Sequence, residues 1–152
     1  MRVEKLPRVK TTLRPSNHPY MSGPWTPQHE EVNAFDLEVI EGEIPDDIDG
    51  IYLRNTENPV HEPLGKHHPF DGDGMIHQIA FSGSKATYRN RFVRTRCFEA
   101  EQIAGGALWG GLADGPGVSK RPGFCAKGDI KDAASTDIVV HAGKAIATFY
   151  QC

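Results

Sequence analysis

Long apolar runs are absent from this 152-residue sequence, and no apolar segment follows the basic residues near its N-terminus. We therefore predict neither a membrane-spanning helix nor a secretory leader. The basic residues are expected to form a solvated tail, with a transit peptide as the alternative; they are Arg2, Lys5, Arg8, Lys10 and Arg14. The expectation is a soluble, cytoplasmic protein.

Cysteine is also scarce, because the sequence has only Cys97, Cys125 and Cys152, with no CxxC spacing. An odd number of cysteines without a secretory leader is typical of reduced thiols. The sequence has no GxxxxGK loop, no HExxH and no GxSxG motif. These absences remove the corresponding phosphate-binding, zinc-protease and serine-hydrolase hypotheses.

An excess of positive charge is missing as well, since the formal net charge is −3. One local basic run nevertheless carries interleaved aromatic side chains; its arginines are Arg89, Arg91, Arg94 and Arg96. Strand alternation would place the first two on one face and the last two on the other. We expect ion pairs with nearby carboxylates or simple solvation, and keep a nucleic-acid-binding β-domain as a third hypothesis.

Glycine (16 residues) and proline (11 residues) are abundant, which favours short elements, many turns and an all-β architecture. The length suits one ordinary domain. Residues 1–33 are predicted to be an extended N-terminal arm, because five prolines between positions 7 and 27 oppose regular structure. Residues 34–152 would form the domain proper.

Two hairpins are the clearest predicted elements. The first joins Met75–Phe81 to Lys85–Val93, and the second joins Asp137–Val140 to Ala145–Tyr150. We also predict short strands at Leu37–Ile40 and Gly50–Arg54, and a helix at Phe98–Ile103 that ends at Gly105-Gly106. The second hairpin runs to Cys152 as if the chain were cut within a sheet, and such open edges predict self-association.

A group of possible metal ligands lies between the predicted strands: His61, His67, His68, Asp71, Asp73 and His77. Local spacing alone does not build a coordination shell, so ordinary loop chemistry is the preferred interpretation. The string Asp71-Gly72-Asp73-Gly74 fails as a calcium loop, because Met75 stands where an oxygen ligand is needed and Ser82 stands where a glutamate is needed. It also fails as a dinucleotide fingerprint, because His77 replaces the third glycine.

Four strings, in order, resemble the N-terminal motifs of the carotenoid cleavage oxygenases, a family that also includes lignostilbene dioxygenases and a retinoid isomerase. They are GIYLRNTENP at 50–59, HPFDGDGMIH at 68–77, YRNRFVRT at 88–95 and STDIVVHAG at 135–143. The resemblance covers about residues 34–152. One departure is Thr56-Glu57, which stand where the family has Gly-Pro, and this predicts an altered turn.

The resemblance implies a seven-bladed β-propeller, of which this chain would be the incomplete N-terminal part. Iron(II) on the propeller axis would be held by four histidines, and second-shell glutamates would orient most of them. None of the seven histidines here matches an iron-ligand position; those ligands are expected downstream of Cys152. The 152-residue chain alone would therefore bind no iron and be inactive.

The resemblance also implies roles for three residues. Thr136 matches a small β-branched residue beside the open coordination site of the iron, where it would act as a steric gate. Leu112 and Phe149 match the tyrosine and lysine with which stilbene-cleaving members bind a phenol. Neither side chain can hydrogen-bond a phenolate, so an apolar polyene is the preferred substrate.

The leading hypothesis is an N-terminal fragment of an iron(II)-dependent dioxygenase. In the full-length protein, dioxygen and a carotenoid, apocarotenoid or related alkene would react to give two carbonyl products. The alternative is a non-catalytic, truncated family member or a partner-binding β-domain. Peripheral membrane contact is compatible with a polyene substrate, and nucleic acid is not an expected partner.

Overall fold

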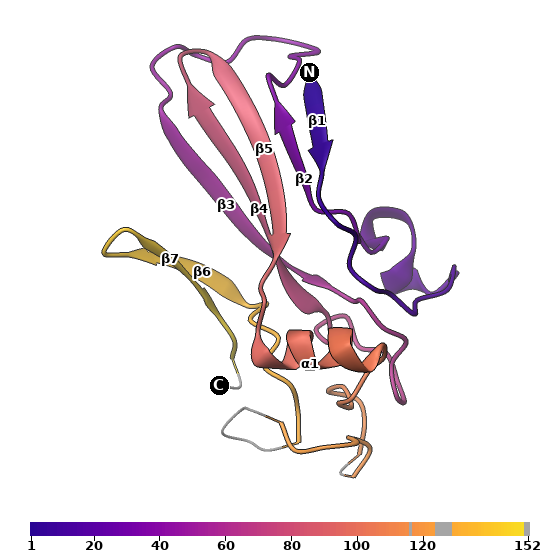
Figure 1. The fold of residues 1–152 in the computed structure, drawn as a ribbon. Helices are drawn as coiled ribbons and strands as arrows, with labels where there is room; N and C mark the ends of the chain where they lie inside the picture. The colour runs from indigo at the N-terminus through magenta and orange to yellow at the C-terminus, as the bar shows by residue number, and fades with distance from the viewer. Residues whose placement is uncertain (116, 124–128, 151–152) are drawn as a thin grey trace.

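The computed structural model describes residues 1–115, 117–123 and 129–150. Its main body is a five-stranded antiparallel sheet with the strand order β1-β2-β5-β4-β3, and β6 and β7 form a separate two-stranded sheet. One helix, α1, lies across the end of the large sheet (Figure 1). The all-β prediction is confirmed. No helix of the described residues is long and apolar enough to span a membrane.

The centre of the large sheet is the hairpin of β4 (Asp73–Ser82) and β5 (Lys85–Phe92). Gly83 and Ser84 form its turn with φ of 53° and 60°, values that match the right-handed twist of the two strands. The predicted hairpin is confirmed. Along β5, Ala86, Asn90 and Phe92 are buried. The expectation that strand alternation places Arg94 and Arg96 on the opposite face is wrong, because β5 ends at Phe92 and Arg96 begins α1.

The other strands extend the sheet on both sides. β3 (Gly50–Asn58) pairs with β4 and is longer than predicted. Thr56 and Glu57 lie inside this strand, so the expectation that they occupy a turn is wrong. On the other side, β2 (Val32–Phe35) pairs with β5, and β1 (Arg2–Lys5) pairs with β2.

Two predictions for the N-terminal part are wrong. β1 gives the arm regular structure, because it ends before the first proline and finds its hydrogen-bond partners in β2. Two short 3-10 helices follow, at Pro19–Met21 and Gly23–Trp25. The predicted strand at Leu37–Ile40 does not form: β2 takes its place a few residues earlier, and Ile40 is 98% exposed. The domain boundary at residue 33 stays a prediction.

The hydrophobic core lies where α1 covers the end of the sheet. It consists of Val9, Val60, Met75, Phe92 and Phe98. Met75 is fully buried, and the Phe92 and Phe98 rings stack with their centroids 5.2 Å apart. Burying a side chain of this size contributes about 1.5–3 kcal/mol, so this cluster is the main reason why the helix docks.

Buried polar groups reinforce the same region. The Asn90 side chain accepts a hydrogen bond from the Val32 N–H at 2.7 Å and donates to the Glu30 carbonyl at 2.8 Å. Glu31, only 2% exposed, accepts from the Phe92 N–H and pairs with Arg94. The predicted ion pairing of the arginine run is thus confirmed for Arg94.

Helix α1 (Arg96–Ala104) begins at Thr95, whose hydroxyl accepts from the Phe98 N–H at 3.1 Å. It ends at Gly105 in the left-handed conformation, as predicted. A long segment without helix or strand among its described residues leads to the hairpin of β6 (Asp137–His141) and β7 (Lys144–Thr148), which confirms the second predicted hairpin.

Candidate functional site

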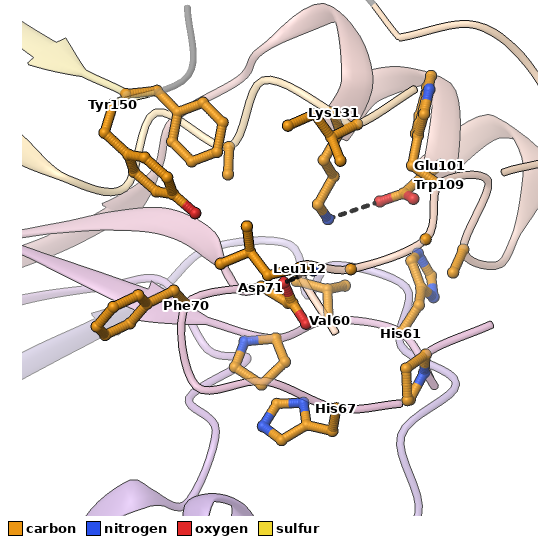
Figure 2. A pocket seen from close by; sticks show the side chains of 18 residues that line it. Val60, His61, His67, Phe70, Asp71, Glu101, Trp109, Leu112, Lys131 and Tyr150 are labelled. Atoms are coloured by element: carbon orange, nitrogen blue, oxygen red, sulfur yellow. Dashed lines mark hydrogen bonds and ion pairs between the residues drawn. The ribbon is translucent and has the colours of Figure 1, made fainter. Parts of the chain in front are cut away.

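A pocket opens at the end of the sheet that α1 covers, where the loops between the strands meet (Figure 2). Its walls come from residues far apart in the sequence: the loop after β3, α1, the glycine-rich segment after α1, and the residues on both sides of β6–β7. The larger apolar side chains are Val60, Phe70, Trp109, Leu112, Phe149 and Tyr150. The cavity volume is about 60 Å³, far below the roughly 300–1,000 Å³ of small-molecule sites. The described residues thus form part of a wall.

A cluster of three charges includes two residues of the pocket wall, Lys131 and Glu101. The Lys131 ammonium donates to Asp73 Oδ2 and to Glu101 Oε2, each at 3.0 Å, and both carboxylate side chains are only 3% exposed. The second oxygen of Glu101 accepts from the Leu108 N–H at 2.9 Å. The cluster therefore joins β4, α1, the segment after α1 and the segment before β6.

The electrostatics of the cluster follow from two acids sharing one base. Burial opposes the charge of Lys131, but Asp73 and Glu101 outweigh it and hold the pKa of Lys131 above its usual range. Burial raises the pKa of the Asp73 carboxyl, and the charge of Glu101 adds to that effect. Within the described part of the chain, no donor reaches Oδ1 of Asp73. The lysine is therefore essential to a cluster that is short of positive charge.

The string Asp71-Gly72-Asp73-Gly74 works as a junction between segments. Asp71 accepts from the Leu112 N–H at 2.7 Å and from the His68 N–H at 2.9 Å, which fixes the wall that carries Leu112. A Cβ on Gly72 would come within 2.3 Å of the Asn58 nitrogen in β3. A Cβ on Gly74 would come within 2.3 Å of the Ala134 carbonyl oxygen. These residues are needed for close packing between segments.

The structure brings the three predicted site residues to one end of the fold. Leu112 and Phe149 both line the pocket. Thr136 lies just before β6, and its hydroxyl oxygen accepts from the Tyr150 N–H at 3.1 Å. Its own N–H donates to the Thr148 carbonyl at 2.9 Å. Thr136 is therefore tied to the residues on both sides of Phe149, while the roles assigned to the three residues remain predictions.

The predicted group of histidines and acids is divided between two places. His61, His67 and Asp71 line the pocket, whereas His77 lies in β4 on a face of the large sheet. His61 is fixed by Gln102, whose amide is oriented by two hydrogen bonds to the backbone of Lys10. The Gln102 Nε2 donor lies 3.3 Å from His61 Nε2, so that ring nitrogen accepts and carries no proton. The other ring nitrogen lies 3.3 Å from the Thr12 hydroxyl. Burial lowers the pKa of His61, in keeping with a neutral ring.

His77 lies on β4 in a hydrogen-bonded row on one face of the sheet. Its Nδ1 is 2.7 Å from the Tyr88 hydroxyl, and its Nε2 is 3.2 Å from the Thr56 hydroxyl. Burial lowers the pKa of His77 and raises the pKa of Tyr88. His77 therefore serves hydrogen bonding within the sheet.

Over residues 1–115, 117–123 and 129–150, no three histidine, cysteine or acidic side chains converge in a way that could hold a metal ion. The described residues therefore do not fit an iron centre by themselves. The expectation that the iron ligands lie downstream stays a prediction. Cys125 and Cys152 fall outside the described residues, whereas Cys97 is a buried thiol whose sulfur accepts from the Asp132 N–H at 3.3 Å.

Sequence reasoning missed Lys131, Glu101 and Asn55, which connect the pocket to the sheet. Lys131 and Asp73 are 58 positions apart, and Lys131 and Glu101 are 30 apart, so no local pattern marked them. The available signal for Asn55 was its place in the 50–59 string.

The family follows from comparison with known proteins. Residues 25–151 match the family model described as retinal pigment epithelial membrane protein. A carotenoid cleavage oxygenase of Mycobacterium tuberculosis is 40% identical over 134 residues, which are 87% of this chain and 24% of the relative. The chain belongs to the carotenoid cleavage oxygenase family. The resemblance inferred from the four motifs is confirmed.

Solved structures of the family show the same arrangement of the backbone. The lignostilbene dioxygenase of Pseudomonas brassicacearum matches with a TM-score of 0.71 and 29% identity, over 87% of this chain and 27% of that one. A cobalt-substituted apocarotenoid oxygenase of Synechocystis matches with a TM-score of 0.60 and 30% identity, over 81% and 26%. These neighbours are β-propeller enzymes, which confirms the fold class. The chain spans about a quarter of the length of its relatives.

Proposed function

We propose that this chain is the N-terminal part of an iron(II)-dependent dioxygenase that cleaves a carbon–carbon double bond of a carotenoid, apocarotenoid or related conjugated alkene. The products would be two carbonyl compounds. One observation carries the proposal: in a member of this family, Thr136, Leu112 and Phe149 gather at one end of the fold. The printed names of a relative and a solved neighbour, a carotenoid cleavage oxygenase and an apocarotenoid oxygenase, support the reaction class.

The metal would be held by histidines outside this chain, because the described residues do not gather a set of ligands. The cobalt-substituted neighbour supports a metal centre in the family. Bound iron would supply the redox chemistry that dioxygen requires. This chain would contribute the shape of the site: Thr136 would limit the space beside the metal, and Leu112 and Phe149 would form part of an apolar wall.

An apolar polyene is the preferred substrate, because carbon atoms of aromatic and aliphatic side chains dominate the pocket wall. A phenolic alkene is the second candidate, favoured by the likeness to the lignostilbene dioxygenase. The pocket also has polar groups that could meet a phenol, notably the Tyr150 hydroxyl, which points inward in Figure 2. Two substrates of these classes therefore belong in any assay.

The test is a chimera in which residues 25–150 replace the matching segment of the Mycobacterium tuberculosis relative, compared with the 152-residue chain alone. Iron content and oxygen-dependent cleavage of an apocarotenal and of a hydroxystilbene would be measured for both. We expect about one iron per chimera with cleavage of the apocarotenal, and no iron in the short chain. The unmodified relative serves as the control.

Two results would contradict the proposal. Stoichiometric iron in the short chain would show that the ligands lie within it, and the residues between His61 and His77 would then be mutated first. A chimera that folds and binds iron but cleaves neither substrate would refute a catalytic role for this segment. The latter result would favour the alternative, a partner-binding member of the family. Self-association through sheet edges, cytoplasmic location and peripheral membrane contact remain predictions.

A further inference from the structure

A side chain of the large sheet contacts the backbone on both sides of Thr136. Asn55 lies in β3, yet its Nδ2 donates to the Ala134 carbonyl at 2.8 Å and lies 3.4 Å from the Asp137 carbonyl. These two carbonyls stand on either side of Thr136. One amide group therefore brackets the segment that carries the candidate gate.

The orientation of this amide is fixed by its other end. Asn55 Oδ1 accepts from the Thr56 N–H at 3.1 Å, so the nitrogen is the atom that faces the two carbonyls. The contact is thus a donor contact, and a carboxylate of the same shape could not make it. An aspartate here would instead place its negative charge against two carbonyl oxygens.

The segment that Asn55 holds, residues 131–136, is called the strap below. Three of its residues are buried: Ala133, Ala134 and Ser135. Ala134 has a left-handed φ of 48°, which is unfavourable for alanine by about 1–2 kcal/mol. The Gly74 N–H donates to the Ala133 carbonyl at 2.7 Å, and the Ala134 N–H donates to the Asp132 side chain at 3.0 Å. The strained turn is therefore maintained by contacts within the strap and with the large sheet, and those of Asn55 reach carbonyls on both sides of Thr136.

We propose that Asn55 is a positioning residue, whose amide sets the place of Thr136 through the Ala134 and Asp137 carbonyls. The catalytic part of this inference rests on the proposed function, because only there does the place of Thr136 affect a reaction. The structural part, in which Asn55 positions Thr136, is independent of the proposed function. Loss of the amide is expected to free the strap and the junction with Tyr150, while the β4–β5 hairpin keeps its stability.

The first measurement is amide hydrogen exchange of the 152-residue chain with Asn55→Ala. We expect exchange across residues 134–150 to be about tenfold faster than in the wild type, with unchanged protection of residues 73–92. Asn33→Asp is the matched control, because Asn33 uses only its oxygen, which accepts from Arg91 at 2.6 Å, and aspartate keeps that acceptor. Asn55→Gln, which keeps the amide but displaces it by one methylene, is expected to give an intermediate rate. If Asn55→Ala unfolds the whole chain, this second variant decides the question.

Unchanged exchange of residues 134–150 in both Asn55 variants would overturn the inference. A second measurement separates it from the proposed function: a double-mutant cycle of Asn55→Ala and Thr136→Ala on kcat/KM in the chimera described above. We expect strong non-additivity, since the Asn55 change has little left to disturb once Thr136 is truncated. If hydrogen exchange is faster but the two substitutions have additive effects on kcat/KM, Asn55 still positions Thr136. That result would refute a role of Thr136 beside the metal.

Discussion

Lys131 is the shared positive partner of the two buried acids in the candidate site. It neutralises two carboxylates that come from different elements and are both almost fully buried. A buried ion pair contributes little net stability relative to an apolar replacement of the whole group, but removing one partner leaves an uncompensated charge. The cluster is therefore a point where a single substitution has a large effect.

We predict that Lys131→Met lowers the free energy of unfolding by about 3–5 kcal/mol, because Asp73 and Glu101 would remain buried without their counter-charge. Denaturant titration followed by circular dichroism measures the change. The matched control is Lys5→Met, which removes the exposed pair with Glu30 and is expected to change stability by less than about 1 kcal/mol. Equal effects of the two substitutions would contradict the importance of the buried cluster.

At the scale of elements, hairpins and the helix could be predicted from neighbouring residues. Strands whose partner strand is distant in the sequence could not. Both hairpins follow from alternating strands around short turns, and the end of α1 follows from its terminal glycine. Its start at Arg96 lies two residues before the predicted start at Phe98. β1 was missed because its partner lies some 30 positions away in β2. The strand at Leu37–Ile40 was wrongly predicted because β propensity does not show which residues find a partner strand.

Gly74 joins two such elements, the large sheet and the strap. A Cβ at this position would come within 3 Å of three backbone atoms of Ala133 and Ala134. We therefore predict that Gly74→Ala destabilises the chain by at least about 1–3 kcal/mol, as measured by denaturant unfolding. Gly106→Ala is the control, because nothing lies within 4 Å of the place its methyl group would take, and it is expected to be neutral or slightly stabilising. A mild effect at Gly74 would mean that the strap can move away from β4.

At the scale of the whole molecule, four buried or half-buried histidines weaken the fold in acid. Burial lowers the pKa of each member of this set: His29, His61, His67 and His77. Since the unfolded chain would bind protons near pH 6.5 and the folded chain only at lower pH, stability is full above pH 6.5 and is lost as the pH falls through the folded values. Asp73, whose pKa burial raises, acts in the opposite direction.

We predict that the Tm falls by several degrees between pH 7 and pH 5, as measured by thermal scans at constant ionic strength. In His61→Gln the fall is expected to be smaller, because one of the four groups no longer titrates. His141→Gln, at an exposed position of the β6–β7 hairpin, is the control and should keep the full difference. A Tm that rises toward pH 5 would show that Asp73 outweighs the histidines.

The candidate site was only partly predictable from the sequence. Thr136, Leu112 and Phe149 were named through the family motifs, and the structure brings them to one end of the fold. Lys131, Glu101 and Asn55 were not, because a buried charge or a bracketing amide becomes visible only when its partners are in place. The same holds for Asp71 and Gly74, whose partners belong to segments far along the chain.

The sequence by itself determined the hairpins, the C-terminal end of the helix and the family, since turn chemistry, alternation and motif order are all local properties of the chain. Only the tertiary structure decided how these pieces are joined. Lys131 reaches acids 58 and 30 positions away, and Asn55 reaches the strap 79 positions away. Such contacts depend on close packing around Gly72 and Gly74, and close packing is a property of segments brought together by folding.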